Sequence, residues 1–148
     1  MEAIIFVGIQ ASGKSTYYKN NLFNTHLRIS NDLLKTKNRE KLLLEFCKYT
    51  NMPFVVDNTN FSKEIRRHYL NFCKEIEFSV KCYYFKTDLQ RSILWNSKRI
   101  GNDRIPDVGI LGTHKKMEIP TVEEGFHELF YVDFVDGNFV LMDWKNEI

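Results

Sequence analysis

A phosphate-loop motif directly follows the first apolar segment of the chain. Segment 3–7, Ala-Ile-Ile-Phe-Val, is an uninterrupted run of strand formers, which predicts a strand buried on both faces of a sheet. Residues 8–15, Gly-Ile-Gln-Ala-Ser-Gly-Lys-Ser, match G-x-x-x-x-G-K-[ST] without deviation. Glycines let the backbone curl so that successive N–H groups face an anion at a helix N-terminus. The alternative, a plain glycine turn, does not need the strand before it or the helix after it, so the motif predicts binding of a nucleoside triphosphate.

The residue types in this loop also predict roles. Lys14 is expected to reach the β- and γ-phosphates, and the Ser15 hydroxyl to coordinate Mg²⁺. The bound nucleotide is expected to be ATP or another nucleoside triphosphate. Its remaining contacts are expected from the rest of the loop and the first helical turn, namely Gly8, Gln10, Ala11, Ser12, Gly13 and Thr16.

Strands and helices alternate along the rest of the chain. Further strands are predicted over 26–30, 53–57 and 80–85, and helices over 16–24, 32–49, 62–76, from about 88, and near 107–116. Asn31 or Asp32 is expected to cap the helix over 32–49, whose apolar positions are Leu33, Leu34, Leu42, Leu43 and Phe46. The helix over 62–76 is expected to begin at a Ser62 cap and to bury Ile65, Tyr69, Leu70 and Phe72. Two more strands are predicted around the Asp136-Gly137 turn. This order predicts an α/β protein with a doubly wound, mainly parallel sheet, the P-loop NTPase fold, as one domain over 1–148.

Composition excludes several classes of protein. The chain is 43% hydrophobic and 27% charged, and no apolar run approaches the 18 or so residues of a membrane span. No signal peptide is recognisable, and the three cysteines are expected to be free thiols, so a cytoplasmic location is expected. Residues 1–117 carry 20 Lys and Arg against 11 Asp and Glu, whereas 118–148 carry one Lys against eight acids. The basic part favours an anionic partner such as nucleotide or nucleic acid, and a solvated surface is the alternative.

Two acids and one basic segment are candidates for chemistry beyond nucleotide binding. Asp32 follows the second predicted strand and is placed to accept a proton from an acceptor hydroxyl, with a helix N-cap as the alternative. Asp57 ends the third predicted strand, as a ligand of the site or as a turn former. The segment 98–104 is basic and contains a glycine, which favours a lid over the triphosphate against a solvated helix end.

These residues together resemble the kinase module of 5′-hydroxyl polynucleotide kinases. The matching segments occur in family order over about residues 3–130, at 7–16, 29–32 (Ile-Ser-Asn-Asp), 56–60 (Val-Asp-Asn-Thr-Asn), 96–99 (Asn-Ser-Lys-Arg), 104–106 and 120–126 (Pro-Thr-Val-Glu-Glu-Gly-Phe). The Asp-Asn-Thr-Asn and Pro-Thr-x-x-Glu-Gly-Phe segments discriminate far better than the phosphate loop, which many enzymes share.

The resemblance implies ATP-dependent phosphorylation of the 5′-OH end of RNA or DNA, in nucleic acid repair. Asp32 falls on the family's general base, and Lys14 and Arg99 fall on the residues that stabilise the transferring γ-phosphate. Lys35 matches a basic position that contacts the 3′ phosphate of the acceptor. Further substrate contacts are expected from Asp57, Asn58 and Arg104.

Two positions depart from the family pattern, and one activity is not expected. Asn31 and Trp95 stand where the family often has arginine, and Trp95 is expected either to pack in the core or to stack on a base. No Asp-x-Asp pair exists for a phosphatase nucleophile. The chain is therefore expected to be either a stand-alone kinase or one part of a repair system whose other activities, such as a ligase or a phosphatase, lie on other chains. RNA and DNA remain alternative acceptors, and ATP and GTP alternative donors.

Two other functions fit the same residues. A related P-loop kinase acting on a nucleoside, a sugar or another metabolite would share the loop, base and lid but would not need Lys35. A non-catalytic ATP-sensing module would not need Asp32 or Arg99 for its function. Steep dependence on ionic strength would distinguish a polynucleotide acceptor from a small neutral one.

Overall fold

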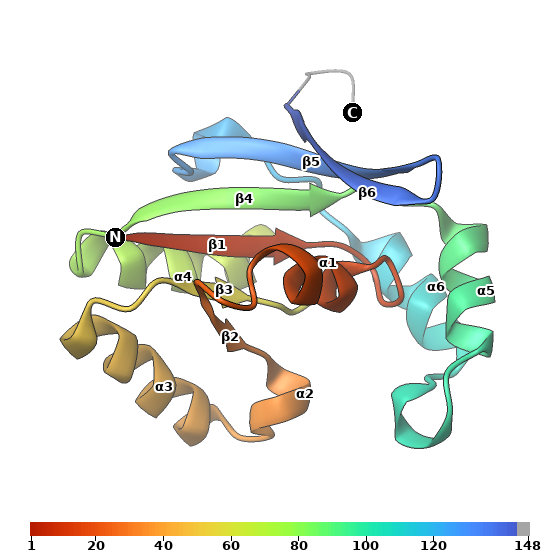
Figure 1. Cartoon of the computed structure of the whole chain (residues 1–148), viewed down its shortest axis with the longest axis horizontal. Helices are drawn as coiled ribbons and strands as arrows, with labels where there is room; N and C mark the ends of the chain where they lie inside the picture. The colour runs from red at the N-terminus through yellow and green to blue at the C-terminus, as the bar shows by residue number, and fades with distance from the viewer. Residues whose placement is uncertain (145–148) are drawn as a thin grey trace.

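A six-stranded sheet forms the centre of the molecule in the computed structural model, which describes residues 1–144 (Figure 1). The strands are β1 (Glu2–Val7), β2 (Leu27–Ile29), β3 (Phe54–Val56), β4 (Ser79–Phe85), β5 (Glu128–Val135) and β6 (Asn138–Asp143). They are ordered β2-β3-β1-β4-β5-β6. The first five run parallel, and β6 pairs antiparallel with β5. The predicted mainly parallel sheet is confirmed.

The strand that leads into the phosphate loop lies in the middle of this sheet. β1 pairs with β3 on one side and with β4 on the other, and every side chain from Ala3 to Val7 is buried. A strand buried on both faces has no solvent-facing positions, which explains why its sequence is uninterrupted rather than alternating. The loop is therefore attached to a central strand that is buried on both faces.

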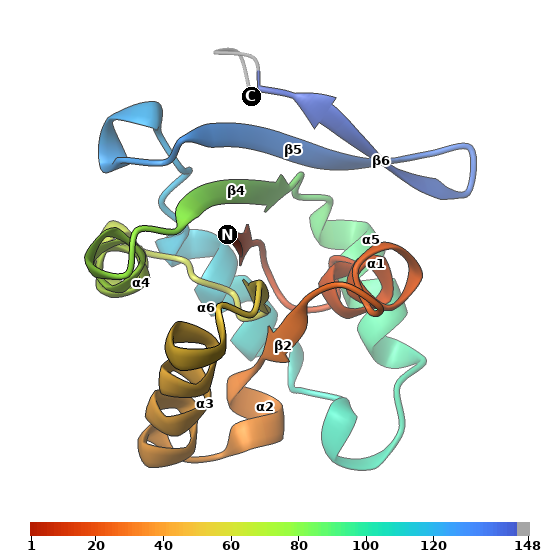
Figure 2. The same ribbon diagram turned by 60° about the vertical axis from the view of Figure 1, so that its left-hand side comes forward.

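Helices connect the strands and cover the sheet. They are α1 (Lys14–Asn21), α2 (Asn31–Leu34), α3 (Lys37–Thr50), α4 (Lys63–Glu75), α5 (Leu89–Ser97) and α6 (Asp107–Lys116), with short 3₁₀ turns η1 (Gly101–Asp103) and η2 (Val122–Glu124). α3 and α4 lie on one side of the sheet and α1 and α5 on the other (Figure 2). Among residues 1–144, no helix has the length and apolar character to cross a lipid bilayer.

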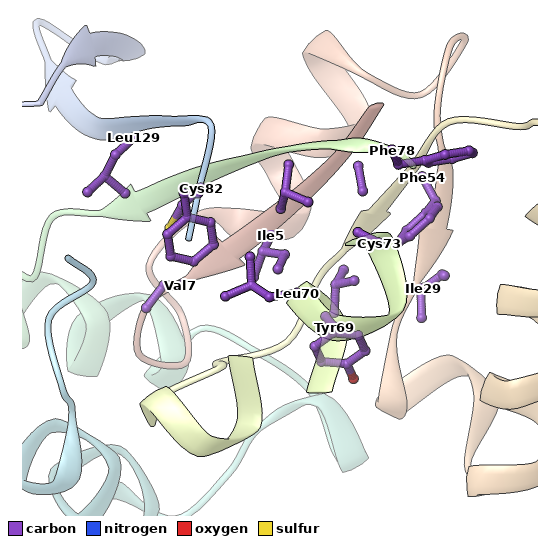
Figure 3. Packing of buried hydrophobic residues seen from close by; sticks show 14 of the residues in the cluster. Ile5, Val7, Ile29, Phe54, Tyr69, Leu70, Cys73, Phe78, Cys82 and Leu129 are labelled. Atoms are coloured by element: carbon purple, nitrogen blue, oxygen red, sulfur yellow. The ribbon is translucent and has the colours of Figure 1, made fainter. Parts of the chain in front are cut away.

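The core has one cluster on each face of the sheet. On the α3–α4 side, Ile5, Phe54 and Cys82 of the strands pack with Leu70 and Cys73 of α4 (Figure 3). On the opposite face, Tyr17 and Tyr18 of α1 pack against the strand residues Ile4, Phe6, Val55, Tyr83 and Phe85. All three cysteines are buried free thiols, as expected from the sequence.

The predicted helix over 32–49 is wrong in its boundaries and in its cap. The chain forms two helices there, because Lys35 has φ 69° and breaks the first after four residues. Ser30, not Asn31 or Asp32, caps α2 by accepting a hydrogen bond from Leu33 N at 3.4 Å. Thr36 caps α3 in the same way at 3.1 Å from Arg39 N. The Asp32 carboxylate is thus not used for capping.

The core face predicted for this region is right in part, because Leu34 and Leu43 pack against the core cluster. Leu33, Leu42 and Phe46 are 61%, 56% and 50% exposed, whereas Leu44 and Cys47 face the core. The predicted helix is counted continuously from residue 32, whereas α3 begins only at Lys37 after a break in the chain. The helical periodicity of the apolar residues is therefore not continuous across this region. In α4 the Ser62 cap is confirmed, but Ile65 is exposed, and Tyr69, Leu70 and Cys73 are buried.

Candidate functional site

Four of the predicted site segments meet at the carboxyl ends of the parallel strands. The phosphate loop follows β1, residues 30–32 follow β2, Asp57 follows β3, and the basic segment follows β4 and α5. Open α/β sheets bind their ligands at this edge. By contrast, a surface pocket lined by Lys74, Phe78, Val80, Glu124 and His127 lies at the amino ends of the strands, since Val80 pairs with Ala3.

Two glycines of the phosphate loop are required by its geometry. A Cβ on Gly8 would lie 2.9 Å from Phe85 Cβ and 3.0 Å from Ser12 Oγ. Gly13 has φ 98°, and a Cβ there would overlap the ring of Phe139 from β6. The loop is anchored to its neighbour by a hydrogen bond from Gly8 N to Thr59 O of 3.1 Å. α1 then begins at Lys14, two residues earlier than predicted, so the first N–H groups of the helix lie directly after the loop, as at helix N-termini that bind anions.

Lys14 lies within the loop rather than in solvent. Its ammonium donates to Gly8 O at 3.0 Å, to Ile9 O at 2.6 Å and to Ser12 Oγ at 3.3 Å. Burial lowers the pKa of Lys14 to about 8; Asp57 and Asp32 raise this pKa, and Arg99 lowers it further. The structure therefore brings the charges of Asp57, Asp32 and Arg99 close enough to Lys14 to act on it.

Ser15 and Asp57 form a polar cluster with a third residue that the sequence analysis missed. Ser15 Oγ donates to Asp57 Oδ2 at 3.0 Å, and Asp57 is 5% exposed. Arg28 of β2 donates from Nε to Asp57 Oδ2 at 2.8 Å and from Nη2 to Ser15 Oγ at 3.0 Å. Arg28 could have been found from the sequence, because it is an arginine within a short predicted strand that ends at the edge where ligands bind.

Mg²⁺ fits the oxygen atoms of this cluster. The Ser15 hydroxyl and the Asp57 carboxylate are hard oxygen donors, and both lie beside the phosphate loop. Residues 1–144 contain no group of three or more His, Cys, Asp and Glu side chains able to hold a metal ion. Such a donor set matches the way Mg²⁺ is bound in phosphoryl-transfer sites, by one or two protein oxygens together with substrate phosphates.

Asp32 and Lys35 lie at the two ends of the short helix α2. Asp32 is exposed, and its carboxylate accepts no hydrogen bond from the described residues. Asn58 Oδ1 accepts from Asn31 N at 2.8 Å, so Asn58 positions the start of α2. Thr36 N donates to Leu34 O at 2.9 Å across Lys35, which makes Lys35 the centre of a strained γ-turn. Strained backbone of this kind concentrates at ligand-binding sites.

The basic segment 98–104 is an exposed loop held together at its base. Asn96 is fully buried, donates to Ile105 O at 2.6 Å and accepts from Ile105 N at 3.1 Å. Arg99 is exposed and donates to Asp103 O at 3.4 Å. Arg104 is exposed after η1. The two hydrogen bonds between Asn96 and Ile105 therefore hold the two ends of this loop together.

The other loop residues occupy several environments. Ser12 is buried, Ala11 has φ 55°, and Thr16 is exposed on the first turn of α1. Gln10 Nε2 donates to Thr113 Oγ1 of α6 at 2.9 Å, so α6 covers one side of the loop.

Trp95 packs instead of standing free. Its ring meets Phe134 and Phe139 edge-on, with centroids 5.2 and 5.9 Å away, and the Arg91 guanidinium lies 4.9 Å above it. Of the two expectations for Trp95, the structure favours packing. Since Phe139 also contacts Gly13, this cluster joins the β5–β6 hairpin to the phosphate loop.

The Pro-Thr-x-x-Glu-Gly-Phe segment is linked to the site by a chain of hydrogen bonds. Glu124 accepts two hydrogen bonds from the fully buried Arg66, at 2.8 Å from Nε and 2.9 Å from Nη2. Arg66 Nη1 donates to Asn60 O at 2.8 Å, and Asn60 Nδ2 donates to Phe6 O at 2.7 Å. Arg66 was missed because a fully buried arginine is rare and only its distant partner explains it. This brace connects residues 120–126 to the loop that carries Asp57.

The chain is similar in sequence to two curated proteins, and no family model matches it. It is 28% identical over 138 residues to a bifunctional polynucleotide phosphatase/kinase of Schizosaccharomyces pombe, covering 90% of this chain and 34% of the relative. It is 29% identical over 153 residues to a putative bifunctional polynucleotide phosphatase/kinase of Acanthamoeba polyphaga mimivirus, covering 97% and 36%. The chain thus spans about a third of the length of these relatives.

Solved structures share the fold at low sequence identity. Kti12 of Chaetomium thermophilum, in complex with ADP-AlF3, has a TM-score of 0.67 at 14% identity, covering 90% of each chain. A gluconokinase from Sinorhizobium meliloti 1021 has a TM-score of 0.63 at 15% identity, covering 89% of this chain and 82% of its own. The expected fold and resemblance are confirmed: the chain has the fold of P-loop kinases, and over most of its length it is similar to one part of bifunctional polynucleotide phosphatase/kinases.

Proposed function

We propose that this protein transfers the γ-phosphate of ATP to the 5′-OH end of a polynucleotide, RNA or DNA. The observation that carries the proposal is the position of Asp32, an exposed carboxylate close enough to raise the pKa of Lys14. A kinase that acts on a hydroxyl needs a carboxylate near that hydroxyl, because the acceptor must lose its proton as it attacks phosphorus. The proposal includes residues 1–148 as a single kinase domain, as expected from the sequence.

One set of side chains binds the phosphates of the nucleotide, and another acts on the acceptor hydroxyl. The loop N–H groups and Lys14 bind the β- and γ-phosphates, and Arg99 approaches from the lid to stabilise charge on the transferring group. Asp32 accepts the proton of the 5′-OH while the new O–P bond forms and the bond to the β–γ bridging oxygen breaks. Ser15 and Asp57 would hold Mg²⁺, which neutralises phosphate charge when bound.

The names of the relatives and the charge distribution favour a polynucleotide over a metabolite. Both relatives are called polynucleotide phosphatase/kinases. Within residues 1–117, Lys and Arg outnumber Asp and Glu by 20 to 11. Lys35 is exposed one turn from Asp32, which suits a contact with the next phosphate of a strand. Asn58 and Arg104 remain proposed substrate contacts.

Label transfer tests this function directly. We expect label from γ-labelled ATP, with Mg²⁺, on 5′-OH oligonucleotides of RNA or DNA, none on 5′-phosphorylated strands, and little on free nucleosides. Catalytic efficiency should fall steeply with salt, because strand binding releases counterions. Lys35→Ala should lower kcat/KM about tenfold for a nucleoside 3′-phosphate and leave a plain nucleoside unchanged. Lys37→Ala, at the exposed start of α3, is the matched control. Label on a free metabolite alone would assign the chain to a small-molecule kinase instead.

Proton uptake tests the nucleotide site separately. Lys14, with its pKa lowered to about 8 by burial, is mostly neutral at pH 9 in the free protein. Bound triphosphate raises that pKa, so ATP binding should take up about one proton at pH 9 and almost none at pH 7. Titration calorimetry in two buffers with different ionisation enthalpies measures this uptake. Lys19→Arg, exposed on α1, should leave it unchanged, and equal uptake at both pH values would contradict this role of Lys14.

A further inference from the structure

The Arg28 guanidinium lies at the position where a metal ion would meet the protein. Its Nε is 2.8 Å from Asp57 Oδ2 and its Nη2 is 3.0 Å from Ser15 Oγ, while Ser15 and Asp57 are themselves 3.0 Å apart. The three side chains form a closed triangle. Both oxygens that fit Mg²⁺ already interact with a positive charge that belongs to the chain.

Burial explains why a charge is needed there. The Asp57 side chain is 2% exposed, whereas that of Arg28 is 28% exposed. A carboxylate removed from water is unstable unless a cation or several donors compensate it. Arg28 supplies that compensation, and its side chain is partly exposed to solvent.

We propose that Arg28 is a resident counter-cation that a divalent metal ion displaces. In the metal-free protein Arg28 neutralises Asp57 and orients Ser15. When Mg²⁺ enters with the nucleotide, two cations compete for the same two oxygens, and their repulsion at this distance releases the guanidinium. The inference rests on nucleotide binding in the proposed function and not on its acceptor, so it holds equally for a metabolite kinase.

Removal of Arg28 changes the affinity for the metal ion in opposite directions under the two possible roles of this residue. If Arg28 opposes the metal ion, its removal strengthens metal binding. If Arg28 only holds Asp57 and Ser15 in place for the metal, its removal weakens metal binding. The two roles therefore predict opposite results for the same substitution.

Electron paramagnetic resonance of free Mn²⁺ provides the measurement, with Mn²⁺ titrated into the full chain in the presence of ADP. We expect Arg28→Gln to lower the Mn²⁺ concentration at half-saturation about tenfold. Arg28→Lys keeps the charge and should stay within about threefold of the unmodified protein. Arg67→Gln removes the same charge from an exposed position of α4 and should change nothing. Unchanged or weaker Mn²⁺ binding in Arg28→Gln would overturn the proposal.

A second measurement does not depend on a variant that loses a buried ion pair. In ¹⁵N spectra of the unmodified protein, the Arg28 Nε–H proton should be protected from solvent exchange, and the missing signal in Arg28→Lys assigns it. Addition of ADP with Mg²⁺ should abolish the protection, whereas ADP with a chelator should not. Protection that persists with Mg²⁺ and ADP bound would exclude displacement. Neither result depends on whether an oligonucleotide is phosphorylated, so failure of the acceptor proposal is recognised separately.

Discussion

Asp32→Asn is expected to lower kcat for transfer to a 5′-OH oligonucleotide by about 10²–10⁴-fold. Asparagine keeps the size of the side chain but cannot take the proton of the attacking hydroxyl. Because Asp32 is exposed and caps no helix, its replacement should cost little stability. The dissociation constant of ATP should stay within about twofold, since Asp32 contributes no group to the phosphate loop itself. Steady-state transfer of label, with ATP binding measured in parallel, separates the two quantities.

A matched substitution shows whether the loss is specific to this carboxylate. Asp136→Asn removes an acid at the β5–β6 turn, where φ is 51° and asparagine is equally suited. That variant should keep full kcat. If Asp32→Asn retained more than about a tenth of kcat, proton transfer to Asp32 would not be part of the reaction.

Glu124→Gln is expected to have the largest effect on stability, lowering the free energy of unfolding by about 3–5 kcal/mol. Arg66 is fully buried, and Glu124 provides both of the carboxylate oxygens that its guanidinium meets. Loss of the negative charge leaves a buried cation without compensation. Urea unfolding at neutral pH measures the change, and the exposed neighbour variant Glu123→Gln should differ by less than about 0.5 kcal/mol.

A double substitution separates charge compensation from packing. Arg66→Met with Glu124→Leu removes both charges and should recover most of the stability lost in Glu124→Gln. Nucleotide affinity should not recover, because Arg66 also donates to Asn60 O, and Asn60 ties the Asp57 loop to β1. A stable double variant with full nucleotide affinity would show that the brace has no function in the site.

The sequence determined the strand, phosphate loop and helix at the start of this protein because their determinants are local. The phosphate loop, the strand before it and the helix after it are consecutive in the chain, and their residue types impose the conformation directly. β1 could be predicted as a central strand because burial on both faces leaves an uninterrupted apolar run. The β5–β6 hairpin could be predicted because Asp136-Gly137 fits the turn that joins its strands.

Only the tertiary structure decided which charged side chains pair with one another. Arg28 meets Asp57 across 29 positions of sequence, and Arg66 meets Glu124 across 58. No pattern of hydrophobic periodicity encodes such pairs, because the two charges meet only when their elements have packed together. The division of residues 31–50 into α2 and α3 escaped prediction for a related reason. A positive φ at Lys35 is unfavourable for the isolated segment, and packing of the whole fold maintains it.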